Sequence, residues 1–253
     1  MRTQTVEASE GEITYMGRIH NIEGKKNKMD SLRSSAFTKH ARNITVAARM
    51  GGGDPAYNAT LKLAIDKAKA DNMPNDNIKR AINKGIGATD GANYEHITYE
   101  GYGPGGVALI IECLTDNKNR TAGNVRHHLE RCGGNLGTAG CVSFMFERKG
   151  AIAIDKEACP LDEESLMEIA LEAGVEDFAS EDTYYEIITA PDVYSDVRDA
   201  LEKENVPIMS GEITMLPSTY TEVPDDKKKS LQKLLDALDE DDDIQNVYDN
   251  MQH

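Results

Sequence analysis

The chain has 253 residues, with 28 Lys and Arg against 44 Asp and Glu, and a formal net charge of −16. This length suits about one to three domains, and a hydrophobic content of 39% with 28% charged residues excludes disorder of the whole chain. The longest plain apolar run, Val107–Ile111, is too short to cross a membrane. Residues 1–15 have no apolar stretch of the signal-peptide kind and hold one Arg against three Glu. We therefore expect a cytoplasmic protein without a membrane partner.

The charge is divided unevenly along the chain. Residues 16–90 hold 14 basic and 7 acidic residues, residues 91–150 hold six of each, and residues 151–253 hold 7 basic and 28 acidic residues. Screening over about 8–10 Å lets distant lobes act independently. One end can therefore attract polyanions while the other repels them. The alternative is that both ends are ordinary solvated faces.

Three helices are predicted in the basic part. In the segment 30–50, apolar residues recur at helical spacing and place basic residues on another face. The glycines at 51–53 end this helix, and Asp54 and Pro55 are interpreted as the N-cap and first residue of the next. That helix ends before Met73 and Pro74, and a third helix follows up to residues 85–87. Three short helices with basic outer faces predict a compact bundle.

Strands are predicted after Asp90. The β-rich runs 97–102 and 107–114 are joined by the glycine- and proline-rich segment 101–106, which indicates a strand pair. A helix is predicted over 119–132, with Gly133 just beyond its end. The glycine-rich segment 133–140 then leads to expected strands at 141–146 and 151–155.

The remaining elements predict a second α+β unit. Their order is a helix at 162–173, strands near 175–178 and at 184–189, a helix at 190–203 and a strand at 208–216, which from residue 151 is the βαββαβ order of ferredoxin-like domains. After a last helix at 226–238, the strand 244–248 is expected to return to the first unit. The predicted class is a multi-domain α+β protein, with an N-terminal three-helix bundle and two ferredoxin-like α+β domains. The expected divisions are an extension and basic arm at 1–28, a helical basic domain at 29–90, an α+β domain at 91–150 plus 217–253, and an inserted acidic ferredoxin-like domain at 151–216.

No group of residues in the sequence predicts catalysis or a cofactor. The segments 101–106 and 133–140 lack the strand-to-helix context of phosphate loops, and the adjacent His127 and His128 point about 100° apart on a helix, so they do not easily share a metal. The four cysteines form no CxxC pair and are expected to be reduced and mostly buried. The acidic run 239–243 lacks the spacing and glycine of a calcium loop, which favours a solvated turn. We expect a non-enzymatic protein that uses neither metal nor cofactor.

Nucleic-acid binding is better supported, because basic residues can neutralise phosphates. Aromatic residues are sparse between residues 16 and 90, so a groove or phosphate surface is favoured over successive base stacking. The loop 133–140 is either a tight structural loop or a functional one that enters a groove. The candidate binding residues are Lys25, Lys26, Lys28, Arg33, Lys39, Arg42, Arg49, Lys62, Lys69, Lys79, Arg80 and Lys84. The candidate residues of functional loops are Tyr102, Gly103, Pro104, Gly105, Asn119, Arg120, Asn135, Leu136 and Gly137.

Several long runs carry a family resemblance. They are GGGDPAYNATLKLAIDKAKADNMPNDNIKRAINKG, YEGYGPGGVALIIECLTDNKNRTAGNVRHHLERCGGNLGTAGCVSFMFERKG and DDIQNVYDN. They resemble the YebC family, which includes the mitochondrial translational activator of cytochrome c oxidase, over roughly residues 16–251. The resemblance implies three domains, one helical and two α+β, and no enzymatic chemistry. It implies either a DNA-binding transcriptional regulator or a ribosome-associated translation factor that relieves stalls.

The chain departs from the family pattern at its start. Members usually have a Trp before a basic segment, whereas this chain has no Trp and reads MGRIHNIEGKK from Met16. Residues 1–15 precede the usual start, so Met16 is an alternative initiator. Contacts made by this arm in other members are therefore not carried over to this chain.

Three functions follow from these observations. The first is a ribosome-associated, RNA-binding translation factor, mostly monomeric, whose basic bundle holds ribosomal RNA. The second is a DNA-binding transcriptional regulator, which needs a recognition helix and usually a dimer. The third, an enzyme or small-ligand domain, rests on fold analogy alone. The charge division and the resemblance favour the first.

Overall fold

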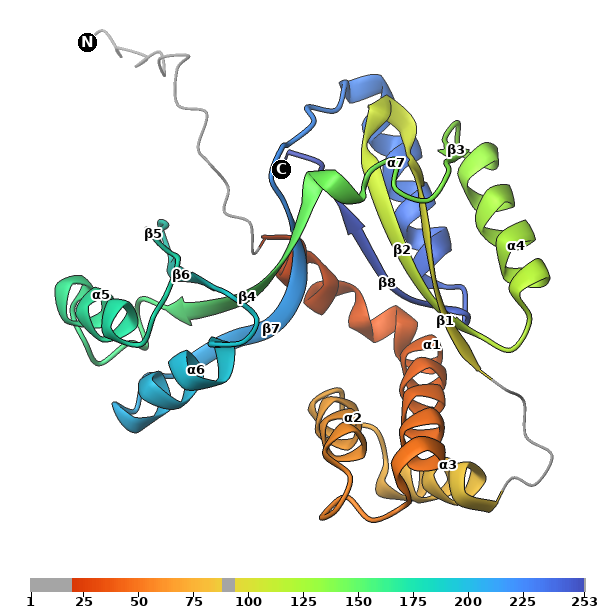
Figure 1. Ribbon diagram of the computed structural model, residues 1–253. Coiled ribbons are helices and arrows are strands. Elements are labelled where there is room, and N and C mark those ends of the chain that lie inside the picture. Colours follow the sequence, from red (N-terminus) through yellow and green to blue (C-terminus); the bar gives the residue numbers. More distant parts are fainter. Residues whose placement is uncertain (1–19, 88–93, 253) are drawn as a thin grey trace, which may run out of the picture. The chain divides into compact units, whose positions relative to one another are not determined.

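The computed structural model describes the backbone of residues 20–87 and 94–252 and the side chains of residues 35–87 and 94–252 (Figure 1). The described chain separates into two compact units. One contains residues 23–149 and 213–252, and the other contains residues 150–212 together with residues 20–22. Each unit is described by itself below.

Three helices form the N-terminal part of the larger unit: α1 (His20–Gly51), α2 (Ala59–Ala70) and α3 (Asn75–Gly87). Their shared core is built from the predicted apolar faces, with Ile44, Leu61 and Ile78 almost fully buried. The backbone of α1 begins ten residues before the expected start at Asp30. The predicted bundle is therefore confirmed, with a longer first helix.

The predicted start of α2 at Asp54 and Pro55 is wrong. Residues 55–57 form a turn in which the Asp54 carboxylate accepts the backbone N–H of Ala56 at 2.9 Å. The N-cap is Asn58, whose side-chain oxygen accepts the N–H of Leu61 at 3.0 Å. The side-chain amide of Asn58 also donates to the carbonyl of Ala47 on α1, so one buried residue starts α2 and ties it to α1.

Helices α1 and α3 approach closely at a threonine and a glycine. The hydroxyl of Thr45 lies 2.7 Å from the Ala41 carbonyl and 3.1 Å from the Ala81 carbonyl, on α1 and α3 respectively. A Cβ at Gly85 would lie 2.5 Å from the Thr45 carbonyl oxygen. The third helix continues through Gly85 to Gly87. Gly85 therefore allows close helix packing and does not end the helix.

The first sheet has the strand order β3-β1-β2-β8. Its strands are β1 (Glu95–Tyr102), β2 (Ala108–Thr115), β3 (Asn135–Leu136) and β8 (Ile244–Asp249). Helices α4 (Lys118–Arg131) and α7 (Asp225–Asp239) share one buried cluster with β2 and β8. The antiparallel pairing of β8 with β2 confirms that the last strand returns to this sheet.

The expected strand at 141–146 is wrong. Residues Ser143–Met145 form a 3-10 turn (η2), and a single long strand, β4 (Phe146–Asp155), follows it. A Cβ at Gly150 would lie 2.6 Å from a ring carbon of Tyr194. This glycine therefore lets an aromatic ring pack on the strand and does not mark a turn between two strands.

The second sheet has the strand order β5-β6-β4-β7. It adds β5 (Asp177–Ser180), β6 (Tyr184–Thr189) and β7 (Ile208–Pro217), with helices α5 (Glu163–Glu172) and α6 (Tyr194–Lys203). Chain order and strand order together are ferredoxin-like, as the sequence predicts. Helix α6 starts four residues later than expected, and its core is shared with α5, β4 and β6.

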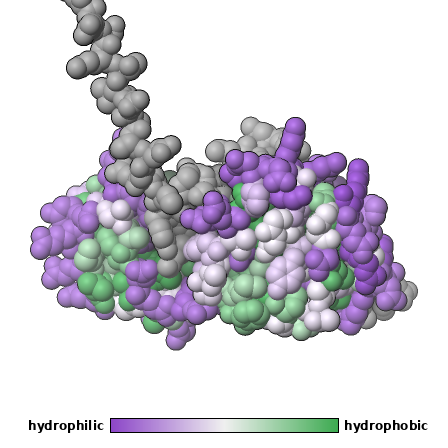
Figure 2. Space-filling view, turned by 90° about the horizontal axis from the view of Figure 1, so that it is seen from above, coloured by the Kyte–Doolittle hydropathy of each residue, from purple (hydrophilic) through white to green (hydrophobic). Residues whose placement is uncertain are grey.

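Polar side chains cover much of the surface, with apolar patches between them on the face shown in Figure 2. Large exposed apolar side chains include Met50, Tyr57, Leu63 and Ile86 of the helical part, and Phe144 of the 3-10 turn. Such scattered exposure is common in folded proteins and does not by itself define a site.

Candidate nucleic-acid interface

Helices α2 and α3 present five exposed lysines. The buried residues of the two helices recur at helical spacing, so the lysines lie on the opposite face, toward solvent. Examples are Leu61 and Ile65 on α2 and Ile78 on α3. Among the described residues, no hydrogen bond or ion pair engages these lysines, so their ammonium groups are available for phosphate oxygens. They are Lys62, Lys67, Lys69, Lys79 and Lys84, of which Lys67 adds to the predicted set.

The basic residues of α1 are used differently. The ammonium of Lys39 donates to the Asp239 carbonyl at 2.7 Å. The guanidinium of Arg42, only 14% exposed, donates to the carbonyls of Leu114 and Asp242 at 2.8 and 2.7 Å. Arg49 is also partly buried and interacts within the chain. The first role of Lys39 and Arg42 is therefore to join α1 to the loop after α7, and their contact with nucleic acid stays a prediction.

The acidic run 239–243 is solvated only in part, because Glu240 and Asp242 are exposed whereas Asp243 is buried. Its carboxylate accepts from Arg42 at 2.7 Å, from Arg120 at 2.9 Å and from the Thr121 hydroxyl at 2.8 Å. Burial alone raises the pKa of Asp243, but the hydrogen bonds from Arg120, Thr121 and Arg42 bring the pKa below its ordinary value. We call Arg42, Arg120, Thr121 and Asp243 the Asp243 cluster.

Four predicted binding residues belong to the first part of α1, where the structure describes the backbone and not the side chains. They are Lys25, Lys26, Lys28 and Arg33. The departure from the family pattern at 16–26 also lies outside the residues whose side chains are described.

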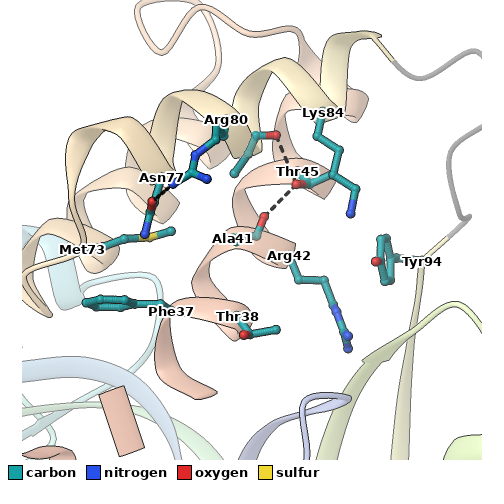
Figure 3. A pocket seen from close by; sticks show the side chains of 11 residues that line it. Phe37, Thr38, Ala41, Arg42, Thr45, Met73, Asn77, Arg80, Lys84 and Tyr94 are labelled. Carbon is teal, nitrogen blue, oxygen red and sulfur yellow. Dashed lines mark hydrogen bonds between the residues drawn. The ribbon is translucent and has the colours of Figure 1, made fainter. Parts of the chain in front are cut away.

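A pocket of about 480 Å³ lies between α1, α3 and Tyr94, the residue before β1. It brings together the predicted residues Arg42, Arg80 and Lys84 (Figure 3). Arg80 is exposed and donates to the Asp76 carbonyl at 3.3 Å and to the side chain of Asn77. The guanidinium carbon of Arg42 lies 5.1 Å from the centre of the Tyr94 ring, a cation–π contact.

The loop between β1 and β2 is mainly a packing element. Gly103 and Pro104 are buried, and a Cβ at Gly103 would lie 3.1 Å from Leu231 on α7. Gly105 is exposed with φ of +83°, which favours glycine. The Tyr102 hydroxyl donates to the Cys141 carbonyl at 3.1 Å. Of the four predicted residues in this loop, 102–105, only Gly105 is exposed to solvent.

The loop 133–140 is anchored at both ends by β1. Asn135 and Leu136 form the short strand β3, paired with Tyr102 and Gly101, and the N–H of Gly137 donates to the Glu100 carbonyl at 2.8 Å. The Glu100 carboxylate accepts the N–H groups of residues 140, 142 and 143 at 2.7–2.9 Å. Burial raises the pKa of Glu100, but these N–H donors bring it below its ordinary value.

The start of α4 is ordered by an Asx cap. The Asn117 side chain accepts the N–H of Arg120 at 3.1 Å, and Arg120 itself turns to Asp116 and Asp243. Asn119 is exposed beside them. His128 lies 3.3 Å from Asp241, whereas His127 is exposed. Among the described residues no group of three His, Cys, Asp or Glu side chains is placed to hold a metal ion.

Comparison with known proteins identifies the family. The model of the TACO1/YebC N-terminal domain matches residues 17–88, and the model of the TACO1/YebC second and third domain matches residues 94–251. The chain belongs to the TACO1/YebC family.

Two similar members are named "probable transcriptional regulatory protein". That of Clostridioides difficile (strain 630) is 58% identical over 93% of this chain and 98% of its own length. That of Geobacillus kaustophilus is 52% identical over 91% of this chain and 94% of its own length. The crystal structure of a conserved hypothetical protein from Aquifex aeolicus is similar with a TM-score of 0.74 and 43% identity, over 89% of this chain and 92% of that one. The names of the two family members describe regulatory proteins and no enzymatic activity.

Three residues of this TACO1/YebC chain escape sequence reasoning. Tyr94 follows a segment that no helix or strand pattern covers, and Glu100 resembles any polar residue of an alternating strand. Asp243 is hidden in a run of five acids. For Tyr94 and Asp243 the available signal was positional, since each lies just before a predicted strand, where side chains from other elements meet. Glu100 lies within the predicted strand 97–102 and has no such signal. In the described part of the chain, no helix combines the length and apolarity that a membrane span needs.

Proposed function

We propose that this TACO1/YebC protein is a non-enzymatic, ribosome-associated, RNA-binding translation factor that relieves stalled translation. The observation that carries the proposal is the set of five lysines on α2 and α3, which have no partner among the described residues. In a chain of net charge −16, such a local cationic surface favours one polyanionic partner over general adsorption.

The negative charge of the smaller unit favours contact between the polyanion and the larger unit. Residues 150–212 hold 18 acidic and 3 basic residues. Repulsion from phosphates then disfavours that unit as the contact, while solvent or basic proteins can face it. Ribosomal RNA with its proteins offers both kinds of surface, whereas long duplex DNA offers phosphates alone.

The test is co-sedimentation of the full chain with ribosomes over a salt series. The variant K62Q/K69Q/K79Q removes three exposed charges from α2 and α3. The control K203Q/K229Q/K233Q removes three exposed lysines from α6 and α7, for the same change in net charge. If each lost lysine contacts one phosphate, the slope of log affinity against log salt falls by about 2 in the first variant only. Equal binding by the two variants contradicts the proposal.

A DNA-binding transcriptional regulator is the second candidate, and the names of the similar proteins favour it. It requires side chains that read bases, such as Asn43 and Arg49, to reach a major groove. Asn43 donates to Gln245 at 2.9 Å within the chain, which argues against this role. In-cell crosslinking with sequencing separates the candidates, since a regulator yields discrete promoter DNA and a translation factor yields a ribosomal RNA locus.

A further inference from the structure

We propose that the pocket between α1, α3 and Tyr94 binds one unpaired nucleotide of an RNA strand. We call it the nucleotide pocket, lined by the residues that Figure 3 labels and by Ala81. The base stacks on Tyr94, and Lys84 and Arg80 bind the phosphates next to it. The identity of the strand as RNA rests on the proposed function, whereas the stacking and phosphate contacts do not.

The size and position of the pocket suit this ligand. A cavity of about 480 Å³ lies in the range of small-molecule sites, about 300–1,000 Å³. Phe37 and Met73 lie at one end and Tyr94 at the other, with Lys84 extending from α3 toward the space beside Tyr94 (Figure 3). An apolar wall with a few polar groups is typical of sites that take a planar ring together with a charged group.

The charge of the pocket selects an anionic ligand. Its described lining contains three cationic side chains and no carboxylate, although the chain as a whole is strongly acidic. Arg42 is already countered by the Asp243 carboxylate at 2.7 Å. Within the described part of the chain, Lys84 has no hydrogen-bond or ion-pair partner, and Arg80 donates only to a backbone carbonyl and to a side-chain amide oxygen. Lys84 and Arg80 therefore supply the uncompensated positive charge.

Tyr94 is placed to receive a base. The guanidinium of Arg42 lies 5.1 Å from the ring centre and is itself held by Leu114, Asp242 and Asp243. The Asp243 cluster thus holds the Arg42 guanidinium in place against the Tyr94 ring. Because the ring is already held, less conformational entropy is lost when a base stacks on it. Every base has a π-face, so the contact tolerates any sequence.

Only an unpaired nucleotide can reach this ring. A base within a duplex is stacked above and below and must leave the helix before it can enter a protein pocket. The surface lysines of α2 and α3 contact phosphates of paired and unpaired strands alike. The nucleotide pocket therefore adds a preference for single-stranded segments that the lysine surface alone does not have.

The test is fluorescence anisotropy of the full chain with a labelled 12-nucleotide RNA, single-stranded or annealed to its complement. Y94L removes the ring and K84Q removes one of the two uncompensated cations of the pocket. The matched controls are Y94F, which keeps the ring, and K79Q, which removes an exposed lysine of the same helix outside the pocket. We expect Y94L to weaken single-strand binding about 5- to 150-fold, from the range for one stacked base. Duplex binding by Y94L should not change, and Y94F should retain single-strand binding. K84Q should weaken single-strand binding more than K79Q.

The outcomes separate this inference from the proposed function. Equal losses for Y94L and Y94F, or for single strand and duplex, overturn the nucleotide pocket even if ribosomes co-sediment. Selective loss in Y94L and K84Q supports the pocket even if ribosomes do not co-sediment, in which case the proposed function fails alone. A single-stranded DNA of the same sequence, run in parallel, shows whether the strand must be RNA.

Discussion

Replacing Asp243 by Asn is expected to destabilise the larger unit by about 3 kcal/mol. Removing one partner of a buried ion pair costs about 3–5 kcal/mol, because the other charge stays buried, and Arg42 is only 14% exposed. Arg120 is 46% exposed, so its share falls to that of surface pairs, about 0–1 kcal/mol. Asn keeps one oxygen for the Thr121 hydroxyl, and Arg42 keeps its two carbonyls. Because these hydrogen bonds are retained, we expect the loss of stability to lie at the lower end of the range of about 3–5 kcal/mol.

Hydrogen exchange with mass spectrometry is the suitable assay, because a chain with two units does not unfold in one step. The N–H of Leu114 donates to the Asp243 carbonyl at 2.8 Å, so its opening free energy reports on this loop. The control is Asp242→Asn, an exposed neighbour with the same change of charge. A difference between the two variants below about 0.5 kcal/mol, the usual effect of a surface substitution, would refute the reasoning.

The contribution of Asp243 also has a defined pH dependence. The folded-state pKa is lowered, so the unfolded chain binds more protons between that pKa and the ordinary value of about 3.9. The stabilisation is complete above about pH 5 and disappears as pH falls through the folded-state pKa. The stability difference between the wild type and Asp243→Asn should therefore shrink below about pH 4.

Three further perturbations test other parts of the structure. Glu100→Gln weakens three charge-assisted bonds to the N–H groups of residues 140, 142 and 143, of which only Val142 is buried. The variant should cost about 1.5–3 kcal/mol, measured as faster hydrogen exchange at residues 140–143. Gly85→Ala places a Cβ 2.5 Å from a carbonyl oxygen of α1. Hydrogen exchange in α1 and α3 should show a loss of about 1–3 kcal/mol despite the better helix propensity of Ala. Burial raises the pKa of the Cys113 thiol to about 12, so at pH 8 iodoacetamide should modify Cys113 far more slowly than the partly exposed Cys132. Equal rates for the two thiols would contradict that placement.

The regular elements were predictable because their periodicity is strong. The sequence located β6 at its observed bounds and helices α5 and α7 to within one residue at each end. The errors fall where glycine or a capping residue has two uses. Gly150 permits a ring to pack on a strand, and Asn58 caps α2 from inside the core. Tertiary neighbours decide between such uses, and a single sequence does not contain them.

The sequence predicted which helices carry the basic residues, but not which of those residues are paired within the chain and which are exposed. Counting Lys and Arg located the basic helices correctly, yet a count cannot separate cations consumed within the chain from cations left for a ligand. Arg42 and Lys62 are equivalent in such a count. The structure places Arg42 against Asp243, 201 residues further along the chain, and leaves Lys62 exposed.

This partition changes how nucleic-acid binding should be tested. Charge reversal at Lys39 and Arg42 would break the contacts of α1 with residues 239–243, so lost ribosome binding could reflect lost structure. Neutralisation of exposed lysines on α2 and α3 leaves the Asp243 cluster intact and changes only the surface charge. If K62Q/K69Q/K79Q has the wild-type opening free energy at Leu114 but no longer co-sediments with ribosomes, the lysines bind the partner directly. If Asp243→Asn also loses ribosomes, the bundle must be held against the first sheet for binding.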